Sequence, residues 1–496
     1  MKLKINSDIK SKNVFKNAGL IKFFVDDDSL KTNFQNILKE LNLSFSSELQ
    51  KSFLTEDVNE ISTYTGLEYP AHVRFIKIKI DEKLTNDFFR ETFASQIEDY
   101  RTISVQKLII EIPKKEELSE IFPISSFISQ SIIEGIYLGD YDFEVYKTKK
   151  SPQKKFDIYF NNSQDDNFDK LITETVSLMD AVYFTRDLIN EPSNTMTPKE
   201  LAERTKKKLI PNKIKVTVWN KSQLVKKGMS AVLAVGSSSE SEPCFIEMHY
   251  KPSKPKKKIV LVGKGVTYDT GGYSIKSTSN MIDMKADMAG GASVIGAVLS
   301  AAMNKLPIEI IALVPAVENV ISGSAFKPGD IIKSSSGKSI MVSNTDAEGR
   351  LILADALEYG NKFKPDFMID YATLTGACVV ALGEIAAGIF SKNQELIDMF
   401  KAAGDNTFER IWPLPMWDEY SEMIESDLAD IDNTGPRWGG AITAAKFLEF
   451  FVDNKKNWAH IDLAGPSLKN KYKSYTKKYD PGFGVRLTYQ FLKEIK

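Results

Sequence analysis

Four short, almost uninterrupted apolar runs in the second part of the chain constrain its fold more than any other feature. They are KKIVLVG (257–263), IEIIALVPAV (308–317), FMIDYATLTG (367–376) and WAHIDLAG (458–465). Segments with helical spacing separate them, for example ASVIGAVLSAAM (292–303) and RLILADALEYG (350–360). This alternation predicts a largely parallel sheet covered by helices on both faces. In such a sheet, ligands bind beyond the carboxyl ends of the strands.

The first 168 residues are expected to form a smaller α/β domain of their own. HVRFIKIKI (72–80) alternates isoleucines with lysines, which predicts a strand with one solvent-exposed face. SVQKLIIEIP (104–113) and FDIYF (156–160) predict two further strands, and helical patterns lie around 30–43 and 83–99. We find no catalytic motif in this part of the sequence.

A polar stretch, NNSQDDN (161–167), is suited to a linker between this domain and the next. The apolar spacing that follows predicts a helix over 169–190, which Pro192 of NEPSN (190–194) should end. We therefore expect two domains, 1–168 and 169–496, with the helix at 169–190 linking them.

The composition gives no sign of a nucleic-acid or membrane partner. Lysine plus arginine number 65 and aspartate plus glutamate number 66, so the net charge is −1. We interpret two lysine-rich stretches, 146–155 and 251–258, as solvated loops, with a nucleic-acid patch as the less favoured alternative. We recognise neither a secretory signal nor an apolar run long enough to span a bilayer.

The cysteines and histidines restrict the chemistry further. Cys244 and Cys378 each lie inside an apolar run, which predicts buried, unpaired thiols in a reducing compartment, and hence a cytoplasmic protein. The chain has three histidines, His72, His249 and His460, and no H-E-x-x-H motif. Any metal site must therefore depend mostly on carboxylates.

Three familiar sequence motifs are incomplete or absent in this chain. GKG (263–265) follows a strand, but a dinucleotide fingerprint needs a third glycine at position 268, which is Tyr268. GKS (337–339) resembles the end of a P-loop, but Ile332 stands where that motif needs glycine. A G-x-S-x-G nucleophile elbow is absent.

What remains is a set of three charged stretches, VGKGVTYDTGGYSIK (262–276), MIDMKADMAGG (281–291) and SNTDAEGRL (343–351). They supply Lys264, Asp269, Lys276, Asp287, Asp346, Glu348 and Arg350. Each residue alone has an ordinary interpretation; Thr345 or Asp346, for instance, could cap the helix that follows. Jointly, the four carboxylates could balance two divalent cations, and a neutral lysine amine would add a nitrogen donor that favours zinc, manganese or cobalt.

These stretches resemble the leucyl aminopeptidase family of two-metal, cytosolic peptidases. The similarity covers roughly residues 185–496 and includes NEPSN, PGDII (328–332), ATLTGAC (372–378), GGAITAAKFL (439–448) and AHIDLAGP (459–466). It implies a doubly wound C-terminal catalytic domain with a smaller α/β N-terminal domain. The implied activity is release of N-terminal amino acids, Leu and other apolar residues favoured, from peptides.

The resemblance also implies a role for each site residue. One metal would be held by Asp269, Asp346 and Glu348, and a second by Lys264, Asp269, Asp287 and Glu348, so that Asp269 and Glu348 bridge. Lys276 and Arg350 would be the catalytic pair. The substrate-binding residues would be Met284, Thr373, Leu374, Gly376 and Ala464, with Ser467 in the same pocket.

Further expectations concern cofactors, partners and alternatives. The resemblance implies two divalent ions per subunit, zinc or manganese with magnesium or cobalt as alternatives, a bicarbonate at Arg350 and a homohexamer. The metals would activate a shared water for attack on the first peptide carbonyl. A DNA-binding relative is disfavoured by the net charge of −1. An inactive relative is disfavoured because none of the seven site residues is missing.

Overall fold

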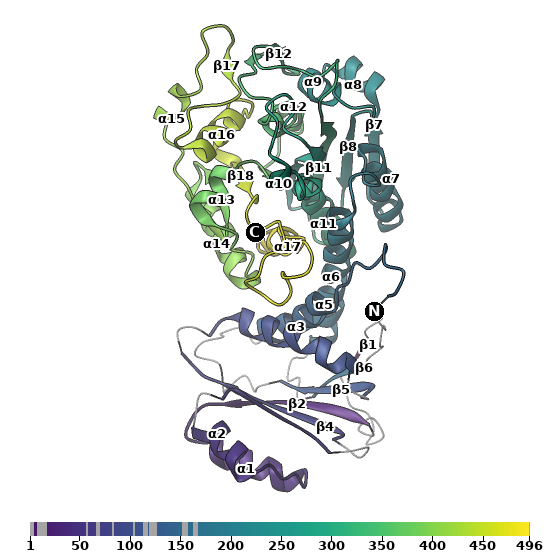
Figure 1. Cartoon of the computed structure of the whole chain (residues 1–496), viewed down its shortest axis with the longest axis vertical. Coiled ribbons are helices and arrows are strands. Elements are labelled where there is room, and N and C mark those ends of the chain that lie inside the picture. The colour runs from purple at the N-terminus through teal and green to yellow at the C-terminus, as the bar shows by residue number, and fades with distance from the viewer. Residues whose placement is uncertain are drawn as a thin grey trace. The chain divides into compact units, whose positions relative to one another are not determined.

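The computed structural model describes residues 4–6, 17–55, 58–65, 70–81, 84–102, 105–112, 118, 126–150, 157–161 and 167–495 (Figure 1). The chain divides into two compact units, Met1–Val176 and Ser177–Lys496. Helix α6 (Phe168–Asn190) contains the point of division and ends immediately before Glu191 and Pro192, as the sequence predicts. Most of the predicted linker, residues 162–166, lies outside the described residues.

The N-terminal unit is an α/β layer structure built on a six-stranded sheet. Its strands, in spatial order, are β1 (Lys4–Asn6), β6 (Asp157–Asn161), β5 (Lys107–Glu111), β2 (Ala18–Val25), β4 (His72–Ile78) and β3 (Glu60–Tyr64). Of these, β3 alone pairs antiparallel among the described strands. The described helices are α1 (Leu30–Glu40), α2 (Ser47–Thr55), α3 (Asn86–Thr102) and α5 (Ser126–Asp140).

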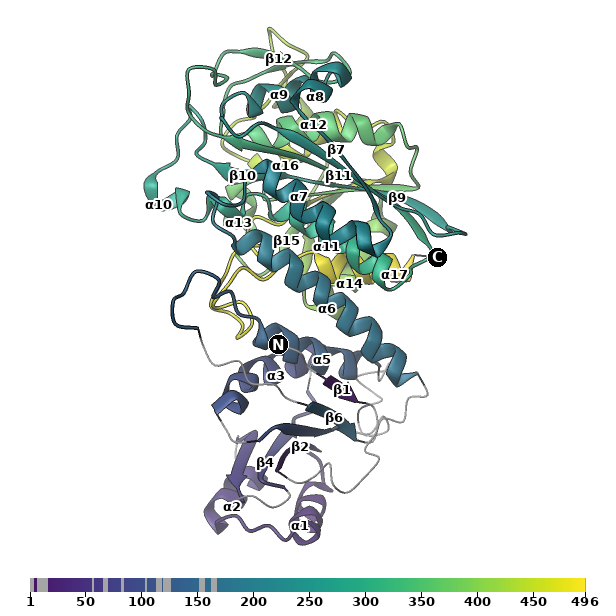
Figure 2. The ribbon, with the colours of Figure 1, turned by 90° about the vertical axis from the view of Figure 1, so that its right-hand side faces the viewer.

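Helices cover both faces of this sheet (Figures 1 and 2). Successive side chains of a strand point to opposite faces, and the phenylalanines of β2 illustrate this. The Phe23 ring contacts Phe89 of α3 at 5.7 Å between centroids, whereas the Phe24 ring contacts Phe34 of α1 at 5.9 Å and Phe53 of α2 at 6.1 Å.

The prediction that the strand in residues 72–80 has one solvent-exposed face is wrong. Every residue of β4 is buried, including Lys77, and Ile80 beyond the end of the strand is exposed. The reason is tertiary, because β4 lies between β2 and β3 in a sheet with helices on both sides. Lys77 is accommodated by placing its ammonium over the Phe53 ring, 5.8 Å from the centroid, and 3.9 Å from Asp26 Oδ2.

The C-terminal unit contains the predicted, largely parallel sheet, which has nine strands. In spatial order they are β16 (Ile411–Pro413), β15 (Ala387–Ser391), β18 (Trp458–Asp462), β14 (Phe367–Ala372), β9 (Lys257–Gly263), β11 (Ile308–Asn319), β8 (Cys244–Tyr250) and β7 (Lys215–Trp219), with β10 (Gly265–Asp269) also paired to β11. The strands predicted from the four apolar runs, β9, β11, β14 and β18, are mutually parallel neighbours at its centre. The α/β fold class is therefore confirmed.

Two layers of helices enclose this sheet (Figure 2). One face is covered by α7 (Pro198–Leu209), α11 (Ala289–Met303), α14 (Gln394–Thr407), α17 (Val485–Glu494) and part of α6; the other by α8 (Lys221–Lys227), α9 (Ser230–Gly236), α12 (Glu348–Asn361) and α16 (Gly440–Glu449). The remaining elements are α10 (Thr278–Met281), α13 (Gly376–Leu382), α15 (Glu419–Glu422) and a small sheet of β12 (Ile331–Lys333), β13 (Ser339–Met341) and β17 (Ile431–Asp432).

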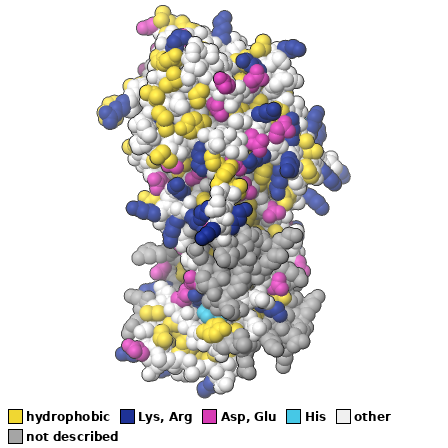
Figure 3. Space-filling model, turned by 45° about the vertical axis from the view of Figure 1, so that its right-hand side comes forward, with side chains coloured by type: hydrophobic (Ala, Val, Ile, Leu, Met, Phe, Trp, Pro, Cys, Tyr) yellow, Lys and Arg dark blue, Asp and Glu magenta, His cyan; other side chains and the backbone are white. Residues whose placement is uncertain are grey.

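The surface and the cysteines agree with the sequence interpretation. Cys244 and Cys378 are buried and unpaired. Residues 251–256 form a mainly exposed loop that leads into β9, and Lys257 and Lys258 begin that strand; of the other lysine-rich stretch, 151–155 lies outside the described residues. Lysine and arginine side chains are interspersed with acidic ones on the visible face of the C-terminal unit (Figure 3). Among the described helices, none combines the length and the apolarity that crossing a bilayer would require.

Glycines bring the start of α11 against the strand ends. A Cβ added to Gly290 would overlap the carbonyl oxygen of Tyr371 in β14 and lie 2.7 Å from its carbonyl carbon. A Cβ added to Gly263, the last residue of β9, would lie 2.6 Å from Gly291 Cα. Helix α11 therefore approaches β9 and β14 with backbone against backbone. This approach carries Asp287, which precedes the helix, to the ends of both strands.

We predict that Gly290→Ala lowers the free energy of unfolding by about 1–3 kcal/mol, because the added methyl group meets backbone that has no rotamer to change. The clash must outweigh the roughly 0.5–1 kcal/mol by which alanine favours a helix over glycine. Urea denaturation measures the difference. In the control Gly323→Ala, the added Cβ meets nothing within 4 Å, so stability should change by less than about 0.5 kcal/mol. An equally small change for Gly290→Ala would contradict the close approach.

Candidate active site

The seven charged residues singled out in the sequence converge beyond the carboxyl ends of the central strands. Lys264 stands between β9 and β10, and Asp269 ends β10. Asp287 follows a short 3-10 helix at Met284–Ala286, and Glu348 is the first residue of α12. The loop after β10 contributes Lys276, the loop before α12 contributes Asp346, and the first turn of α12 contributes Arg350.

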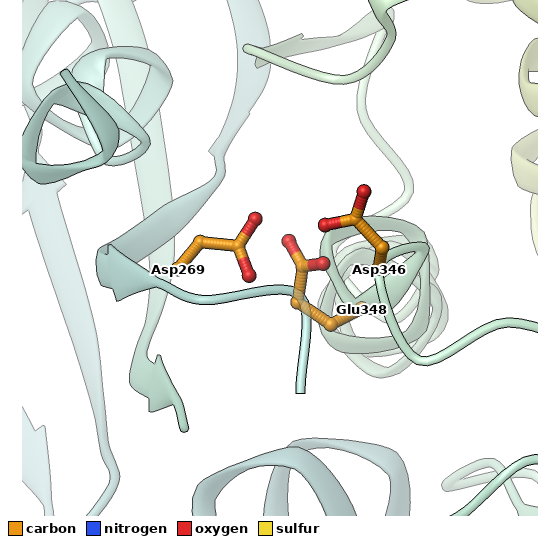
Figure 4. A group of neighbouring side chains, drawn as sticks. All are labelled: Asp269, Asp346 and Glu348. Atoms are coloured by element: carbon orange, nitrogen blue, oxygen red, sulfur yellow. The ribbon is translucent and has the colours of Figure 1, made fainter. Parts of the chain in front are cut away.

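Three of the carboxylates point toward one another (Figure 4). One oxygen atom from each of Asp269, Asp346 and Glu348 lies within 4.8 Å of the others, a grouping that could hold a metal ion. Asp269 and Glu348 are buried and Asp346 is partly buried. Burial of like charges so close together is unfavourable unless cations or protons compensate them.

Two lysines supply part of that compensation. Lys264 Nζ lies 2.9 Å from Asp287 Oδ1 and 2.9 Å from Glu348 Oε1. Lys276 Nζ lies 2.8 Å from Asp269 Oδ2 and also pairs with Asp346 Oδ1. Each ammonium thus bridges two carboxylates. With all six groups ionised, four negative charges minus two positive charges leave a formal excess of two negative charges.

The pKa values of these groups reflect the same excess. Burial, with the neighbouring Asp269 charge second, raises the pKa of Glu348 to about 8. Burial likewise raises the pKa of Asp287 to about 6, although Lys264 opposes the change. Burial alone would lower the pKa of Lys264, but the adjacent carboxylates outweigh it and raise that pKa. Lys264 is therefore an ammonium here. It could ligate a metal through its nitrogen only after losing a proton, which a nearby cation would favour by lowering its pKa.

Buried polar atoms without hydrogen-bond partners also indicate where a cation and an anion could bind. Asp287 Oδ2 is buried without a hydrogen-bond partner among the described residues, while its Oδ1 accepts from Thr373 Oγ1 at 2.8 Å. Arg350 donates from Nη1 to the carbonyl oxygen of Asn433 at 2.8 Å, but its buried Nε has no partner within the described chain. Burial lowers the pKa of Arg350 to about 10. Such orphaned groups are uncommon in folded proteins unless a ligand or water completes them.

The capping interpretation of residues 343–351 is wrong. The N-cap position of α12 is Ala347, and among the described residues no side chain caps the helix. Thr345 instead donates from Oγ1 to the carbonyl oxygen of Gly271 at 2.7 Å and accepts from the amide of Ser274 at 2.8 Å. These bonds tie the loop before α12 to the loop that carries Lys276.

A cavity of about 460 Å³ opens onto these groups. Its walls include the residues that the sequence resemblance assigns to substrate binding: Met284, Thr373, Leu374, Gly376, Ala464 and Ser467. Six of the seven charged residues also line it; Glu348 lies behind the wall and is fully buried. The volume is within the range of small-ligand sites.

The histidines take no part in this site. His249 Nε2 lies 2.8 Å from Glu309 Oε1 at the far end of β11, and His460 Nδ1 lies 2.5 Å from Asp370 Oδ1 within the sheet. His72 belongs to the N-terminal unit.

Sequence reasoning missed two buried polar residues at strand ends. Asn319 ends β11 and donates to Asp269 Oδ1 at 2.8 Å. Asp462 ends β18 and accepts from the amides of Leu374 at 3.1 Å and Ala464 at 3.2 Å, both in the wall of the cavity. The sequence could have indicated both residues, because each is a polar residue close to the carboxyl end of an apolar run that was predicted to be a strand.

Comparisons with known proteins agree with this site. Residues 183–489 match the family described as "Cytosol aminopeptidase family, catalytic domain". A probable cytosol aminopeptidase of Chloroherpeton thalassium is 40% identical over 94% of this chain and 96% of its own length, and one of Clostridium tetani is 41% identical over 92% and 95%. The solved structure of the bottromycin maturation enzyme BotP in complex with Mn has a TM-score of 0.83 at 25% identity, covering 96% of this chain and 99% of that one.

The fold, the carboxylate site and the family matches together define a metal-dependent hydrolase. It is an exopeptidase that acts on the N-terminal end of peptides, that is, an aminopeptidase. The chain belongs to the cytosol aminopeptidase family. The resemblance drawn from the sequence to the leucyl aminopeptidases is thereby confirmed.

The geometry predicts that Lys264 depends on the absence of a side chain at position 349. A Cβ added to Gly349 would lie 2.5 Å from Lys264 Cε and 2.6 Å from its Nζ. Gly349→Ala should therefore displace the ammonium and reduce kcat/KM by about 10²-fold, the effect expected of a misplaced site group.

The cause can be isolated with a double-mutant cycle on the thermal midpoint of the metal-free protein. Once Lys264→Ala has removed the obstructed side chain, adding Gly349→Ala should cost much less than it does in the wild type. Additive effects of the two substitutions would contradict the steric explanation.

Proposed function

We propose that this aminopeptidase holds two divalent cations in the carboxylate site and releases N-terminal residues, Leu and other apolar ones favoured, from peptides. The single observation that carries the proposal is the buried excess of negative charge, with four carboxylates against two ammonium groups. Charge of this kind in a buried site favours the uptake of hard or borderline divalent ions.

The residues present fit such ions. Asp269, Asp346 and Glu348 would hold one cation, a grouping supported by the 4.8 Å limit on their oxygen separations. Lys264, Asp269, Asp287 and Glu348 would hold the other, and the unpartnered Asp287 Oδ2 supports this set. Zinc or manganese is the favoured metal, with magnesium and cobalt as alternatives; the Mn complex of the BotP neighbour supports manganese.

The protein's own groups would then act on the substrate. Divalent cations bound at these carboxylates supply activation of water and polarisation of a peptide carbonyl. Lys276 is about one-sixth exposed, with 17% of its side chain accessible, and lines the cavity. Its ammonium is suited to stabilise negative charge that develops on the substrate carbonyl oxygen.

Arg350 is suited to hold a small anion, which we propose to be bicarbonate. Arg350 belongs to the first turn of α12, where the helix amides and dipole also favour negative charge. Its buried Nε has no hydrogen-bond partner among the described residues. A bound bicarbonate supplies a group that can exchange protons during hydrolysis.

The substrate's first side chain would lie in the cavity beside Met284, Leu374 and Ala464. Burial of an apolar side chain there is favourable. Thr373 and Ser467 make part of the same wall polar, so we expect the preference for leucine to be broad rather than strict.

We also propose, on the family resemblance alone, that the protein is a cytoplasmic homohexamer. A fully active monomer in sedimentation velocity at neutral pH would overturn the hexamer. No observation favours the DNA-binding alternative.

Removal of Asp287 should lower the metal content of the protein. Because Asp287 is assigned to one cation only, Asp287→Ala should bring bound metal toward one ion per subunit with the fold intact. Elemental analysis after gel filtration measures this. Asp283→Ala is the matched control, since Asp283 also lines the cavity but belongs to neither ligand set. Two tightly bound metals in Asp287→Ala would show that the ligand assignment is wrong.

Arg350→Ala and Lys276→Ala should separate catalysis from metal binding. Both variants should keep their metals, and Lys276→Ala should do so easily because Lys276 competes with cations for Asp269 and Asp346. Each should lose about 10²–10⁴-fold in kcat. Added bicarbonate should partly rescue Arg350→Ala and leave Lys276→Ala unchanged.

The measurement is metal content and kcat for both variants, with and without bicarbonate. Loss of metal from either variant would show that the substituted residue helps to hold the metal ions. Wild-type rates in both would overturn the mechanism.

A further inference from the structure

Asn319 lies directly behind the two carboxylates that are assigned to both cations. Its Nδ2 donates to Asp269 Oδ1 at 2.8 Å and to the carbonyl oxygen of Thr345 at 3.0 Å. Glu348 Oε2 is 3.4 Å from the same nitrogen, at the outer limit of a hydrogen bond. One amide group thus contacts both shared carboxylates and the loop that leads into α12.

The chemistry around Asn319 requires its amino group to face the carboxylates. Two carboxylate oxygens and a carbonyl oxygen surround Nδ2, and all three can only accept hydrogen bonds while the carboxylates are ionised. The amide oxygen faces the other way, toward Gly272, where an added Cβ would lie 3.1 Å from it. The alternative amide orientation would place oxygen against three acceptors.

Asn319 is also held rigidly. It is fully buried and ends β11, in register with Asp269 of β10. Its carbonyl oxygen accepts from the amide of Thr270 at 2.9 Å and from Thr270 Oγ1 at 3.0 Å. A donor fixed in this way by the sheet can fix its acceptors.

The remaining contacts show what this arrangement achieves. Asp269 Oδ1 is occupied by Asn319 and by the amide of Gly271, at 2.8 Å each, which leaves Oδ2 toward Lys276. Glu348 Oε2 faces Asn319, while Oε1 faces Lys264. In each carboxylate one oxygen is held from behind and the other points to the place where positive charge is bound.

We propose that Asn319 is a positioning residue that holds the carboxylates of Asp269 and Glu348 at the separation the two cations need. The inference rests on the metal sites of the proposed function. Without its two N–H groups, the carboxylates would lose a shared donor and would repel one another with less restraint. Removing a hydrogen-bond partner of metal ligands typically weakens metal binding 10- to 100-fold.

The test is calorimetric titration of metal-stripped full-length protein with MnCl₂, together with activity as a function of Mn²⁺ concentration. Asn319→Ala removes the donors, and Asn319→Leu removes them while keeping the approximate size of the side chain and adding no charge. Asn361→Ala is the matched control, because Asn361 also joins two segments, through Nδ2 to the carbonyl oxygen of Phe451 at 3.0 Å and through Oδ1 from the amide of Asp453 at 3.2 Å. It lies at the opposite end of α12.

We expect both Asn319 variants to bind Mn²⁺ 10- to 100-fold more weakly, while kcat at saturating Mn²⁺ changes by only a few-fold and Asn361→Ala binds as the wild type does. A purely structural role would lower the thermal midpoint without this separation of metal affinity from kcat. Wild-type affinity in Asn319→Ala overturns the inference, and so does failure of both variants to fold while Asn361→Ala folds. If the wild type itself takes up no metal, the proposed function fails, which is a distinguishable result.

Discussion

The gathering of four carboxylates, three buried and one partly buried, around two lysines is the constraint on which the rest of the catalytic unit depends. Burial, with the neighbouring Asp269 charge second, raises the pKa of Glu348 to about 8, so this acid tends to take up a proton. Lys264 and Lys276 keep the site partly neutral and occupy positions beside the same oxygens that cations would use. Under the proposed ligand assignment, metal ions would take over an electrostatic compensation that the lysines already supply.

Close backbone packing makes this concentration of charge geometrically feasible. The four acids come from three separate segments, because Asp346 and Glu348 share one, and each segment must reach one point without side chains between them. Gly290 allows α11 to meet β14, and Gly349 leaves room on α12 for the Lys264 side chain. The same scaffold occurs at 25% identity in BotP, an enzyme of bottromycin maturation.

The errors of sequence-based prediction were local and had tertiary causes. The alternation of lysine and isoleucine in residues 72–80 predicted one wet face, but helices on both sides of the sheet bury Lys77 as well. Helix capping by Thr345 or Asp346 was an alternative and not the prediction adopted, and it fails for a similar reason, because Thr345 bonds to the loop at Gly271 instead. In both cases a residue's short-range preference was overridden by a partner distant in sequence, which periodicity cannot reveal.

The sequence by itself determined the four central strands of the catalytic unit, their alternation with helices, and the identity of the charged residues at the strand ends. These are local properties, set by hydrophobic period and by where an apolar run stops. Only the tertiary structure decided which lysine pairs with which acid, that Asp287 and Arg350 each keep a buried atom unpartnered, and that Asn319 joins Asp269 to Glu348. Most of these facts depend on distances between residues far apart in sequence, such as Asn319 and Glu348 or Lys264 and Glu348. Such distances are fixed by packing in three dimensions.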